Sequence, residues 1–346
     1  MMQNAPVNSA PSAGKTPMRR IGRFTVTDKL GSGSNGNVLL GHDPIIDRAV
    51  AIKILNNPVG ATDKKQREQQ FINEARAAGR LSHPNIVTIY DASTESGTTF
   101  IAMEFLQGKD LRELMATGKR FDVIDAASIA YKIANALAFA HNQGVIHRDI
   151  KPANIFIVEN NQPKVVDFGI ARVPNRVLDD NGQAQTLFKG NIMGTPNYMS
   201  PEQASSQPVT ALTDVYSLGA VLYEMLTGQK PFSASDFDKL IYNITHKTPK
   251  SPDLLNPDVP EKLAHIVMKA MQKKPHRRYK SAAEMAMALN KFLAREKRAR
   301  RQSPSGRSTT EKDSISMFAG KSNLFWIGWS SFIIAAILAA MAFKSN

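Results

Sequence analysis

The chain has 346 residues, no cysteine and a formal net charge of +14 at pH 7. A chain of this length can bury a large core or two lobes, and the lack of cysteine excludes disulfide bonds and thiolate metal sites. Half of the excess positive charge lies in residues 291–346, which contain ten Lys or Arg and three Asp or Glu. Because the remainder contains no long basic run, we expect no nucleic-acid partner.

The first segment, residues 1–20, is rich in Ala, Pro, Ser and Asn and contains no apolar stretch. A secretory signal peptide needs an apolar central region, so this segment does not fit one. Its composition is typical of disordered chains. We therefore predict a disordered N-terminal tail over residues 1–20.

Short segments rich in β-branched and aromatic residues follow, separated by Gly, Asn, Asp or Pro. Such segments predict strands, and they cover residues 24–30, 37–43, 49–55, 86–92 and 98–105. A helical pattern over residues 64–81 interrupts them. The first part of the chain is therefore predicted to be a mainly antiparallel β lobe with one helix.

A glycine-rich stretch, LGSGSNGNV, joins the first two predicted strands and contains Gly31, Gly33 and Gly36, followed by Val38. Glycines let backbone N–H groups approach a phosphate chain without obstruction by side chains. An ordinary turn between strands would also explain them. A dinucleotide site requires a helix after the glycines, and here a strand follows, so the pattern favours a flap over a nucleotide.

Lys53 ends the apolar stretch AVAIK in the third predicted strand. A buried ammonium group needs an anionic partner. Two partners are plausible, a nucleotide phosphate and Glu74 in the predicted helix. The alternative is a lysine that extends its charged end into solvent from a strand edge.

The pattern changes to helical after Gly108. Apolar residues at three- and four-residue spacing predict helices over residues 125–144 and 213–228, and each segment ends on a glycine. The sequence therefore predicts an α+β protein with a small antiparallel β lobe, a larger helical lobe and a hinge at residues 104–108.

The segment VIHRDIKPANIFI, residues 145–157, contains several charged residues between two pairs of apolar residues. The segment KVVDFG follows it. Asp149 is suited to orient a hydroxyl nucleophile and accept its proton. Lys151 can neutralise charge on a moving phosphoryl group. Asn154 and Asp167 offer the hard oxygen ligands that a phosphate-bound metal prefers. Each residue alone fits a solvated loop, but their order predicts a phosphoryl-transfer site.

Near the other end, residues 293–323 are basic and polar, and residues 324–343 then form 20 positions without a charge. A helix of that length spans about 30 Å, the thickness of a bilayer core. A buried core helix is the alternative. Lys and Arg gather on the N-terminal side, which predicts a single-pass span in the cytoplasmic membrane, a cytoplasmic N-terminal portion and a short tail at 344–346. The basic run, which begins at Lys291, could also contact anionic lipid head groups.

Taken together, these motifs resemble the protein kinases. The resemblance covers Gly31 to Val38, Val50-Ala51-Ile52-Lys53, Glu74, His147-Arg148-Asp149 through Asn154, and Asp167-Phe168-Gly169. Lys151 and the segment GTPNYMSPEQ are similar to the Ser/Thr class, and the predicted span beside a basic linker is similar to bacterial membrane-bound, eukaryotic-like (Hanks-type) kinases. The resemblance implies a bilobal kinase domain over residues 24–292, with an N-lobe at 24–104, a hinge at 104–108 and a C-lobe at 109–292.

The resemblance also implies ATP and Mg²⁺ as cofactors, with Mn²⁺ as an alternative metal. Asn154 and Asp167 would be the metal ligands. The implied catalytic residues are Lys53, Asp149, Lys151, Asn154 and Asp167. The implied nucleotide-binding residues are Leu30, Gly31, Ser32, Gly33, Ser34, Asn35, Gly36, Val38, Ala51, Lys53, Glu74, Met103, Glu104, Leu106 and Phe156.

Further positions have structural or regulatory roles in such kinases. By resemblance, Asp214 would brace the backbone of the catalytic loop, and Arg278 would pair with Glu202. Arg148 would meet a phosphate on the activation segment, for which we take Thr186 as the autophosphorylation candidate. Thr195 would instead bond the catalytic Asp and Lys from the substrate-binding turn. The chain departs from the family at Ser200 and Asn35, where many kinases carry Ala and an aromatic residue.

Three functions remain to be weighed. The first is an active Ser/Thr kinase that transfers the γ-phosphate of ATP to protein hydroxyls, itself included. The second is a nucleotide-binding pseudokinase that acts as a scaffold, although no essential motif residue is missing. The third, a small-molecule phosphotransferase, does not predict the threonine-bearing turn GTPNYMSPE. The sequence leaves dimerisation open and names no substrate.

Overall fold

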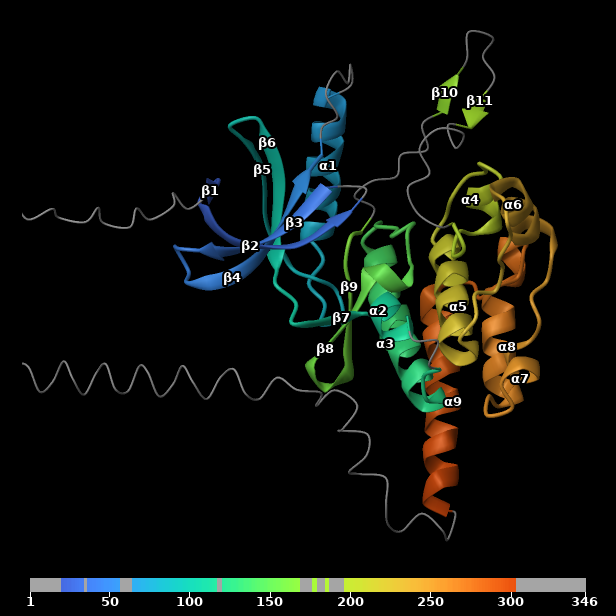
Figure 1. Cartoon of the computed structure of the whole chain (residues 1–346). Helices are drawn as coiled ribbons and strands as arrows, with labels where there is room; N and C mark the ends of the chain where they lie inside the picture. Colours follow the sequence, from blue (N-terminus) through green and yellow to red (C-terminus); the bar gives the residue numbers. More distant parts are fainter. Residues whose placement is uncertain are drawn as a thin grey trace, which may run out of the picture. The chain divides into compact units, whose positions relative to one another are not determined.

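The computed structural model describes residues 20–33, 36–56, 64–116, 120–168, 176–178, 184–186 and 196–302 (Figure 1). The described elements as far as Leu293 belong to one compact unit. Residues 1–19 of the predicted tail, the linker beyond residue 302 and the predicted span at 324–343 lie outside the described residues.

The N-terminal part is a six-stranded antiparallel sheet with the order β1-β2-β3-β4-β6-β5. Its strands are β1 (Arg20–Ile21), β2 (Phe24–Gly33), β3 (Gly36–Asp43), β4 (Arg48–Leu55), β5 (Ile89–Glu95) and β6 (Thr98–Glu104). Helix α1 (Lys64–Gly79) packs on this sheet through Phe71 and Ala75, which form a buried cluster with Ile101 of β6. The sequence patterns of the β lobe are therefore confirmed.

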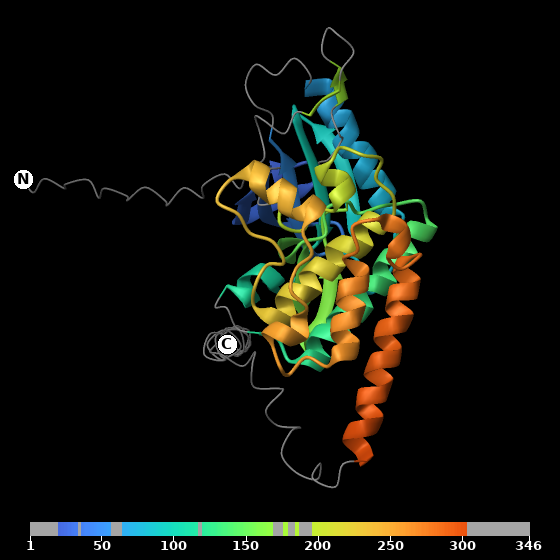
Figure 2. The same ribbon diagram turned by 90° about the vertical axis from the view of Figure 1, so that its right-hand side faces the viewer.

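The C-terminal part is mainly helical. Its helices are α2 (Leu111–Met115), α3 (Val123–Asn142), α4 (Pro201–Ala204), α5 (Leu212–Thr227), α6 (Phe237–His246), α7 (Pro252–Leu255), α8 (Glu261–Ala270) and α9 (Ala282–Gln302). A three-stranded sheet joins β7 (Gly108–Asp110), β8 (Ile155–Val158) and β9 (Gln162–Val165). A separate hairpin pairs β10 (Arg176–Leu178) with β11 (Ala184–Thr186). Figures 1 and 2 both show α3, α5 and α8 grouped apart from the six-stranded sheet.

Helices α3 and α5 lie one to two residues nearer the N-terminus than predicted, and both end within two residues of the predicted glycines. The side chain of Asp122 accepts hydrogen bonds from the backbone N–H groups of Ile124 and Asp125 and so caps α3. Gly144 follows α3 with a φ of +73°, and Gly228 ends α5 with a φ of +70°. Glycine adopts this left-handed conformation without a Cβ penalty, which explains why both helices stop at a glycine.

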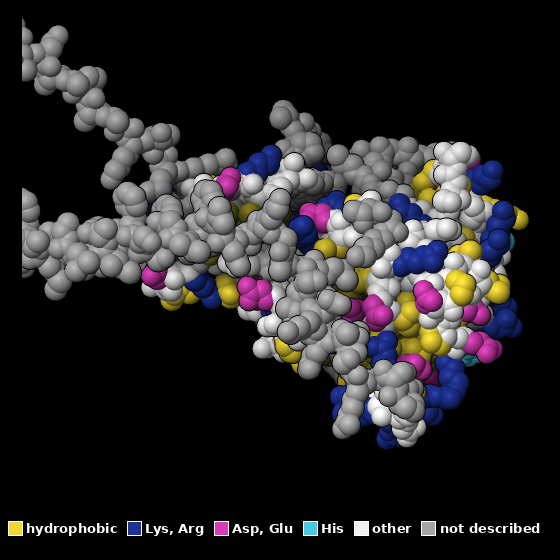
Figure 3. Space-filling view, turned by 60° about the horizontal axis from the view of Figure 1, so that its bottom comes forward, with side chains coloured by type: hydrophobic (Ala, Val, Ile, Leu, Met, Phe, Trp, Pro, Cys, Tyr) yellow, Lys and Arg dark blue, Asp and Glu magenta, His cyan; other side chains and the backbone are white. Residues whose placement is uncertain are grey.

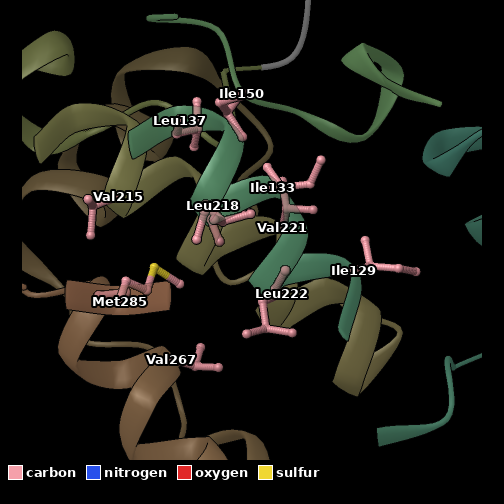
Figure 4. Close-up of a cluster of buried hydrophobic side chains, with 14 of the residues drawn as sticks. Ile129, Ile133, Leu137, Ile150, Val215, Leu218, Val221, Leu222, Val267 and Met285 are labelled. Carbon is pink, nitrogen blue, oxygen red and sulfur yellow. The ribbon is translucent and has the colours of Figure 1, made fainter. Parts of the chain in front are cut away.

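The core of the helical lobe lies between α3, α5 and the helices that follow them. Figure 4 shows Ile133 of α3 beside Val221 of α5, and Leu137 of α3 and Leu218 of α5 belong to the same buried cluster. Val267 and Met285 lie on the other side of α5 in the same buried cluster. Almost every residue of α5 is buried, so this helix is the central support of the lobe.

Helix α3 is also, within the described part of the chain, the one helix long and apolar enough to cross a membrane. Half of its most apolar window is buried inside the lobe. Its apolar positions are those that pack against α5. A buried core helix explains this composition fully, so α3 is no evidence for a membrane span.

The strand bounds differ from the sequence prediction by up to three residues, and the short strand β1 was not predicted. The predicted strand at 86–92 begins at Ile89, because Ile86 instead forms a parallel bridge with Val165 and the N–H of Val87 donates to the Val165 carbonyl. Arg20 and Ile21 pair with Thr25 and Phe24, so ordered structure starts inside the predicted tail. Neither contact has a periodic sequence signal, since each joins only one or two residues.

The described surface carries charges of both signs. On the face in Figure 3, Lys and Arg side chains are interspersed with acidic and apolar ones. The basic run at the end of α9 is exposed, and it comprises Lys291, Arg295, Lys297, Arg298, Arg300 and Arg301.

Candidate active site

The loop between α3 and β8 carries the predicted catalytic residues, and a buried aspartate holds its backbone. Asp214, at the start of α5, accepts the N–H of His147 at Oδ2 and the N–H of Arg148 at Oδ1, both at 2.8 Å. His141, near the end of α3, also bonds Asp214 Oδ2 at 2.8 Å. The brace predicted for Asp214 is thus confirmed, and it ties the loop to the two central helices.

His147 is fully buried, and its ring forms hydrogen bonds with two backbone groups. Its Nδ1 accepts the N–H of Asp149 at 3.2 Å, which leaves Nε2 to donate to the Val166 carbonyl at 3.0 Å. Its ring packs on that of Phe168, with 4.7 Å between the centroids. His147 therefore joins the catalytic loop to the segment that carries Asp167.

Asp149, Lys151 and Asn154 converge on one point. Lys151 Nζ lies 2.8 Å from Asp149 Oδ2, and Asn154 Nδ2 lies 3.2 Å from the same oxygen. Asn154 Nδ2 also donates to the backbone carbonyl of Asp149 at 2.9 Å. The carboxylate is partly exposed, with a relative side-chain accessibility of 22%. It is therefore oriented by two donors yet open to an incoming hydroxyl group.

A contact between Lys53 and Asp167 joins the N-terminal sheet to the segment that follows the catalytic loop. Lys53 is 4% exposed on β4, and its ammonium lies 2.7 Å from Asp167 Oδ1. Lys53 is buried, as predicted, but the anion beside it is Asp167, which is neither of the two partners that the sequence suggested. Glu74 lies in α1, as predicted, but its side chain is outside the described part of the structure, so its pairing with Lys53 stays a prediction.

A buried apolar cluster lies beside Lys53. Ala51 and Met103 form it together with Val87, and Val38, Leu106 and Val166 pack against them. An apolar surface of this kind suits the flat ring of a nucleotide base. The structure thus gathers four predicted nucleotide-binding residues, Val38, Ala51, Met103 and Leu106. Phe156 lies half-buried in β8 and is not a member of this cluster.

The hinge follows Met103. Glu104 donates its backbone N–H to the Thr88 carbonyl, and its carboxylate pairs with Lys164 of β9 at 2.8 Å. Gly108 then enters β7, where a Cβ would lie 2.2 Å from the Ile157 carbonyl oxygen. Only glycine fits this close approach, so the chain crosses between the lobes along a restrained path.

The glycine-rich stretch forms a hairpin, as predicted, with Gly33 opposite Gly36 at its end. Gly36 has a φ of +137°, and a Cβ there would lie 1.7 Å from the Ile54 carbonyl oxygen. Ser34 and Asn35 lie outside the described residues. Leu30, Gly31 and Ser32 precede the turn in β2, so the predicted flap lies directly across β3 from the strand of Lys53.

The donor set near Asp149 fits a magnesium ion. The N–H of Val166 donates to the Asn154 backbone carbonyl at 3.0 Å, which places Asn154 beside the residue that precedes Asp167. Asn154 and Asp167 offer amide and carboxylate oxygens, the hard ligands that Mg²⁺ takes in small number when phosphates supply the rest. In the described part of the chain no cluster of three or more His, Cys, Asp or Glu could hold a metal alone.

The segment after the activation region is anchored by a buried ion pair. Arg278 donates from two nitrogens to the two carboxylate oxygens of Glu202, each at 2.7 Å. Thr213 donates its hydroxyl to Glu202 Oε1 at 2.8 Å. The predicted Glu202–Arg278 pair is confirmed, with Ser200 in place of alanine as the N-cap of α4. Thr195 lies outside the described residues, and Thr186 lies in β11 with its side chain undescribed.

Three further residues of this site were not predicted from the sequence. Val87 and Val166 complete the apolar cluster, and Lys164 restrains the hinge through Glu104. Val166 directly precedes Asp167, so its position was a usable signal. Lys164 carried none, since it meets Glu104 only through the pairing of distant segments.

Comparison with known proteins gives the same picture. Residues 24–291 match the family model described as protein kinase domain. The serine/threonine-protein kinase PknB of Mycolicibacterium smegmatis is 39% identical over 278 residues, which cover 79% of this chain and 43% of that protein. The serine/threonine-protein kinase PrkC of Bacillus subtilis is 37% identical over 267 residues, covering 77% and 40%.

Among solved structures, the PknI kinase domain of Mycobacterium tuberculosis matches with a TM-score of 0.63 and 26% identity, over 81% of this chain and 99% of that one. The chain spans only 40% to 43% of the length of the two curated kinases, yet the match includes every motif from the glycine-rich hairpin to Arg278. The chain belongs to the protein kinase domain family, and the two relatives described above are bacterial serine/threonine kinases.

Proposed function

We propose that the chain is an active serine/threonine protein kinase that transfers the γ-phosphate of ATP to protein hydroxyl groups. The observation that carries this proposal is the convergence of Lys151 and Asn154 on Asp149 Oδ2, in a loop fixed by Asp214. Asp149 orients the substrate hydroxyl and accepts its proton. Lys151 lies where it can offset negative charge on the transferring phosphoryl group.

The nucleotide would bind between the lobes. Its base would lie against Ala51 and Met103, with backbone groups of Glu104 and Leu106 toward its polar edge. Its phosphates would lie under the glycine-rich hairpin and beside Lys53. Magnesium bound to Asn154 and Asp167 would neutralise phosphate charge. A scaffold without catalysis is less favoured, because Lys53, Asp149, Asn154 and Asp167 are all present.

The proposal is tested by transfer of ³²P from γ-labelled ATP to myelin basic protein. We expect transfer with Mg²⁺ and with Mn²⁺, and none after an excess of EDTA, because the phosphates then lack the metal cation that offsets their negative charge. Adding Mg²⁺ back should restore it. Equal counts with and without EDTA would contradict metal-dependent transfer, and no counts above background under any metal would favour the scaffold.

Autophosphorylation on Thr186 forms a second part of the proposal. Arg148 directly precedes Asp149, and a phosphate near its guanidinium would order the activation segment by charge-assisted hydrogen bonds. We expect phosphopeptide mapping of the full chain incubated with ATP and Mg²⁺ to find phosphate on Thr186. Thr186→Ala should lower the activity of the incubated protein. A map of active protein with Thr186 unmodified would contradict this assignment.

We further propose that residues 324–343 anchor the chain in the cytoplasmic membrane, with the kinase domain in the cytoplasm. The length and lack of charge of that segment support this proposal. The exposed basic run from Lys291 to Arg301 supports it through the positive-inside bias and could contact anionic lipids.

A further inference from the structure

Gln203 connects the end of the activation region to the catalytic loop. Its side-chain Nε2 donates to the backbone carbonyl of Arg148 at 2.8 Å. The same side chain accepts through Oε1 from the backbone N–H of Ser200 at 3.1 Å, and its own N–H donates to Ser200 Oγ at 3.3 Å. One amide therefore completes the capping box of α4 and reaches across to the loop.

The carbonyl that Gln203 contacts belongs to the peptide bond that precedes Asp149. The other side of this peptide is fixed as well, since the N–H of Asp149 donates to His147 Nδ1. Arg148 has a φ of +65°, a left-handed conformation that costs energy for a residue other than glycine. Such a conformation persists only where surrounding contacts hold it. Gln203 supplies one of those contacts and Asp214 another.

The helix that carries Gln203 is held in place by buried contacts. Glu202, the neighbour of Gln203, forms the buried ion pair with Arg278, and Ser200 is fully buried. Helix α4 therefore cannot shift easily, and its glutamine holds the Arg148–Asp149 peptide plane against rotation. A rotation of that plane would redirect the Asp149 side chain away from Lys151 and Asn154.

We propose that Gln203 is a positioning residue for phosphoryl transfer, which holds Asp149 in its reactive orientation through the carbonyl of Arg148. This inference rests on the proposed kinase function. It assigns to Gln203 a role apart from helix capping. The two roles can be separated, because a glutamate keeps the capping oxygen but has no N–H to donate.

The experiment compares Gln203→Glu with the wild-type chain in steady-state phosphate transfer and in thermal unfolding. Glutamate suits the capping box, so the melting temperature should stay within about 2 °C of wild type. Its carboxylate would face the Arg148 carbonyl without a hydrogen between them. We expect kcat to fall about five- to twentyfold, as for the loss of one oriented hydrogen bond, with KM for ATP unchanged.

Two further variants complete the test. Gln207→Glu introduces the same charge at an exposed position of the same segment and should match wild type. Gln203→Met removes both donor and acceptor at similar length, and should lower kcat as far as glutamate does while also lowering the melting temperature. A kcat of Gln203→Glu within twofold of wild type, or a change in KM for ATP alone, would overturn the inference. A wild-type chain without any transfer would instead overturn the proposed function, and this inference with it.

Discussion

Replacing Asp149 by asparagine is expected to lower kcat for phosphate transfer by about 10²- to 10⁴-fold, the usual contribution of a positioned general base. Asparagine has the same shape, but its amide cannot accept the proton of a substrate hydroxyl. It also places an NH₂ group or a neutral oxygen opposite the Lys151 ammonium, which lies 2.8 Å from Asp149 Oδ2. Asp149 is not a member of the apolar cluster at Ala51 and Met103, so nucleotide affinity should persist.

The measurement combines single-turnover ³²P transfer with calorimetric binding of a non-hydrolysable ATP analogue in Mg²⁺. Asp258→Asn is the matched control, because it makes the same chemical change at an exposed residue. Asp258 lies in the loop before α8, far from Asp149 in the sequence. It should leave both rate and affinity at wild-type values. If Asp149→Asn kept more than about a tenth of the wild-type rate, Asp149 would not be the base. If it lost analogue binding and its melting transition together, the variant would report on folding instead.

Local pattern was enough to predict the elements that carry the site. The short segment rich in apolar and β-branched residues located the strand of Lys53, and the glycine stops at Gly144 and Gly228 located the ends of α3 and α5. These signals work because strand composition and helix termination depend on neighbours within a few residues. The spacing from Asp149 to Asn154 is likewise local, since one short loop holds both.

The contacts that orient the site could not be predicted in the same way. The Lys53–Asp167 pair, the Lys164–Glu104 pair and the bond from Gln203 to Arg148 each join segments far apart in the chain. Which atoms meet is decided by how α4, β9 and the sheet pack, and a single sequence does not encode that packing in any short window. The Gln203 side chain illustrates the limit, because only the fold shows that its amide reaches the catalytic loop.

Replacing Glu202 by glutamine is expected to lower the free energy of unfolding by about 3 kcal/mol, the lower part of the range for breaking a buried ion pair. The side chains of Glu202 and Arg278 are 4% and 0% exposed, and two short hydrogen bonds join them. Glutamine keeps one acceptor but leaves the guanidinium without a counter-charge. Three backbone carbonyls, those of Leu212, Gln272 and Lys273, still accept from Arg278, which is why we expect the smaller loss.

Urea denaturation at pH 7 measures this effect. Arg277→Gln is the matched control for Arg278→Met, since Arg277 is the exposed neighbour on the same turn, and it should change stability by less than about 0.5 kcal/mol. The double variant Glu202→Gln with Arg278→Met should lose less than the sum of the single losses, because neither charge is then buried alone. Additive losses would show that the two groups do not stabilise each other.

The pH dependence gives an independent check on the same pair. Burial raises the pKa of Glu202, but the hydrogen bonds and charge of Arg278, with the hydroxyl of Thr213, lower this pKa by more, so that it lies below its ordinary value of 4.5. The unfolded chain therefore binds this proton at a higher pH than the folded one, and the stabilisation is present above about pH 4.5 and lost as pH falls through the folded pKa. The stability gap between wild type and Glu202→Gln should be constant from pH 7 to pH 5.5 and narrow below about pH 4.5. A gap that widens in acid would mean that Glu202 is protonated in the folded chain, and Arg278 would then need another anion.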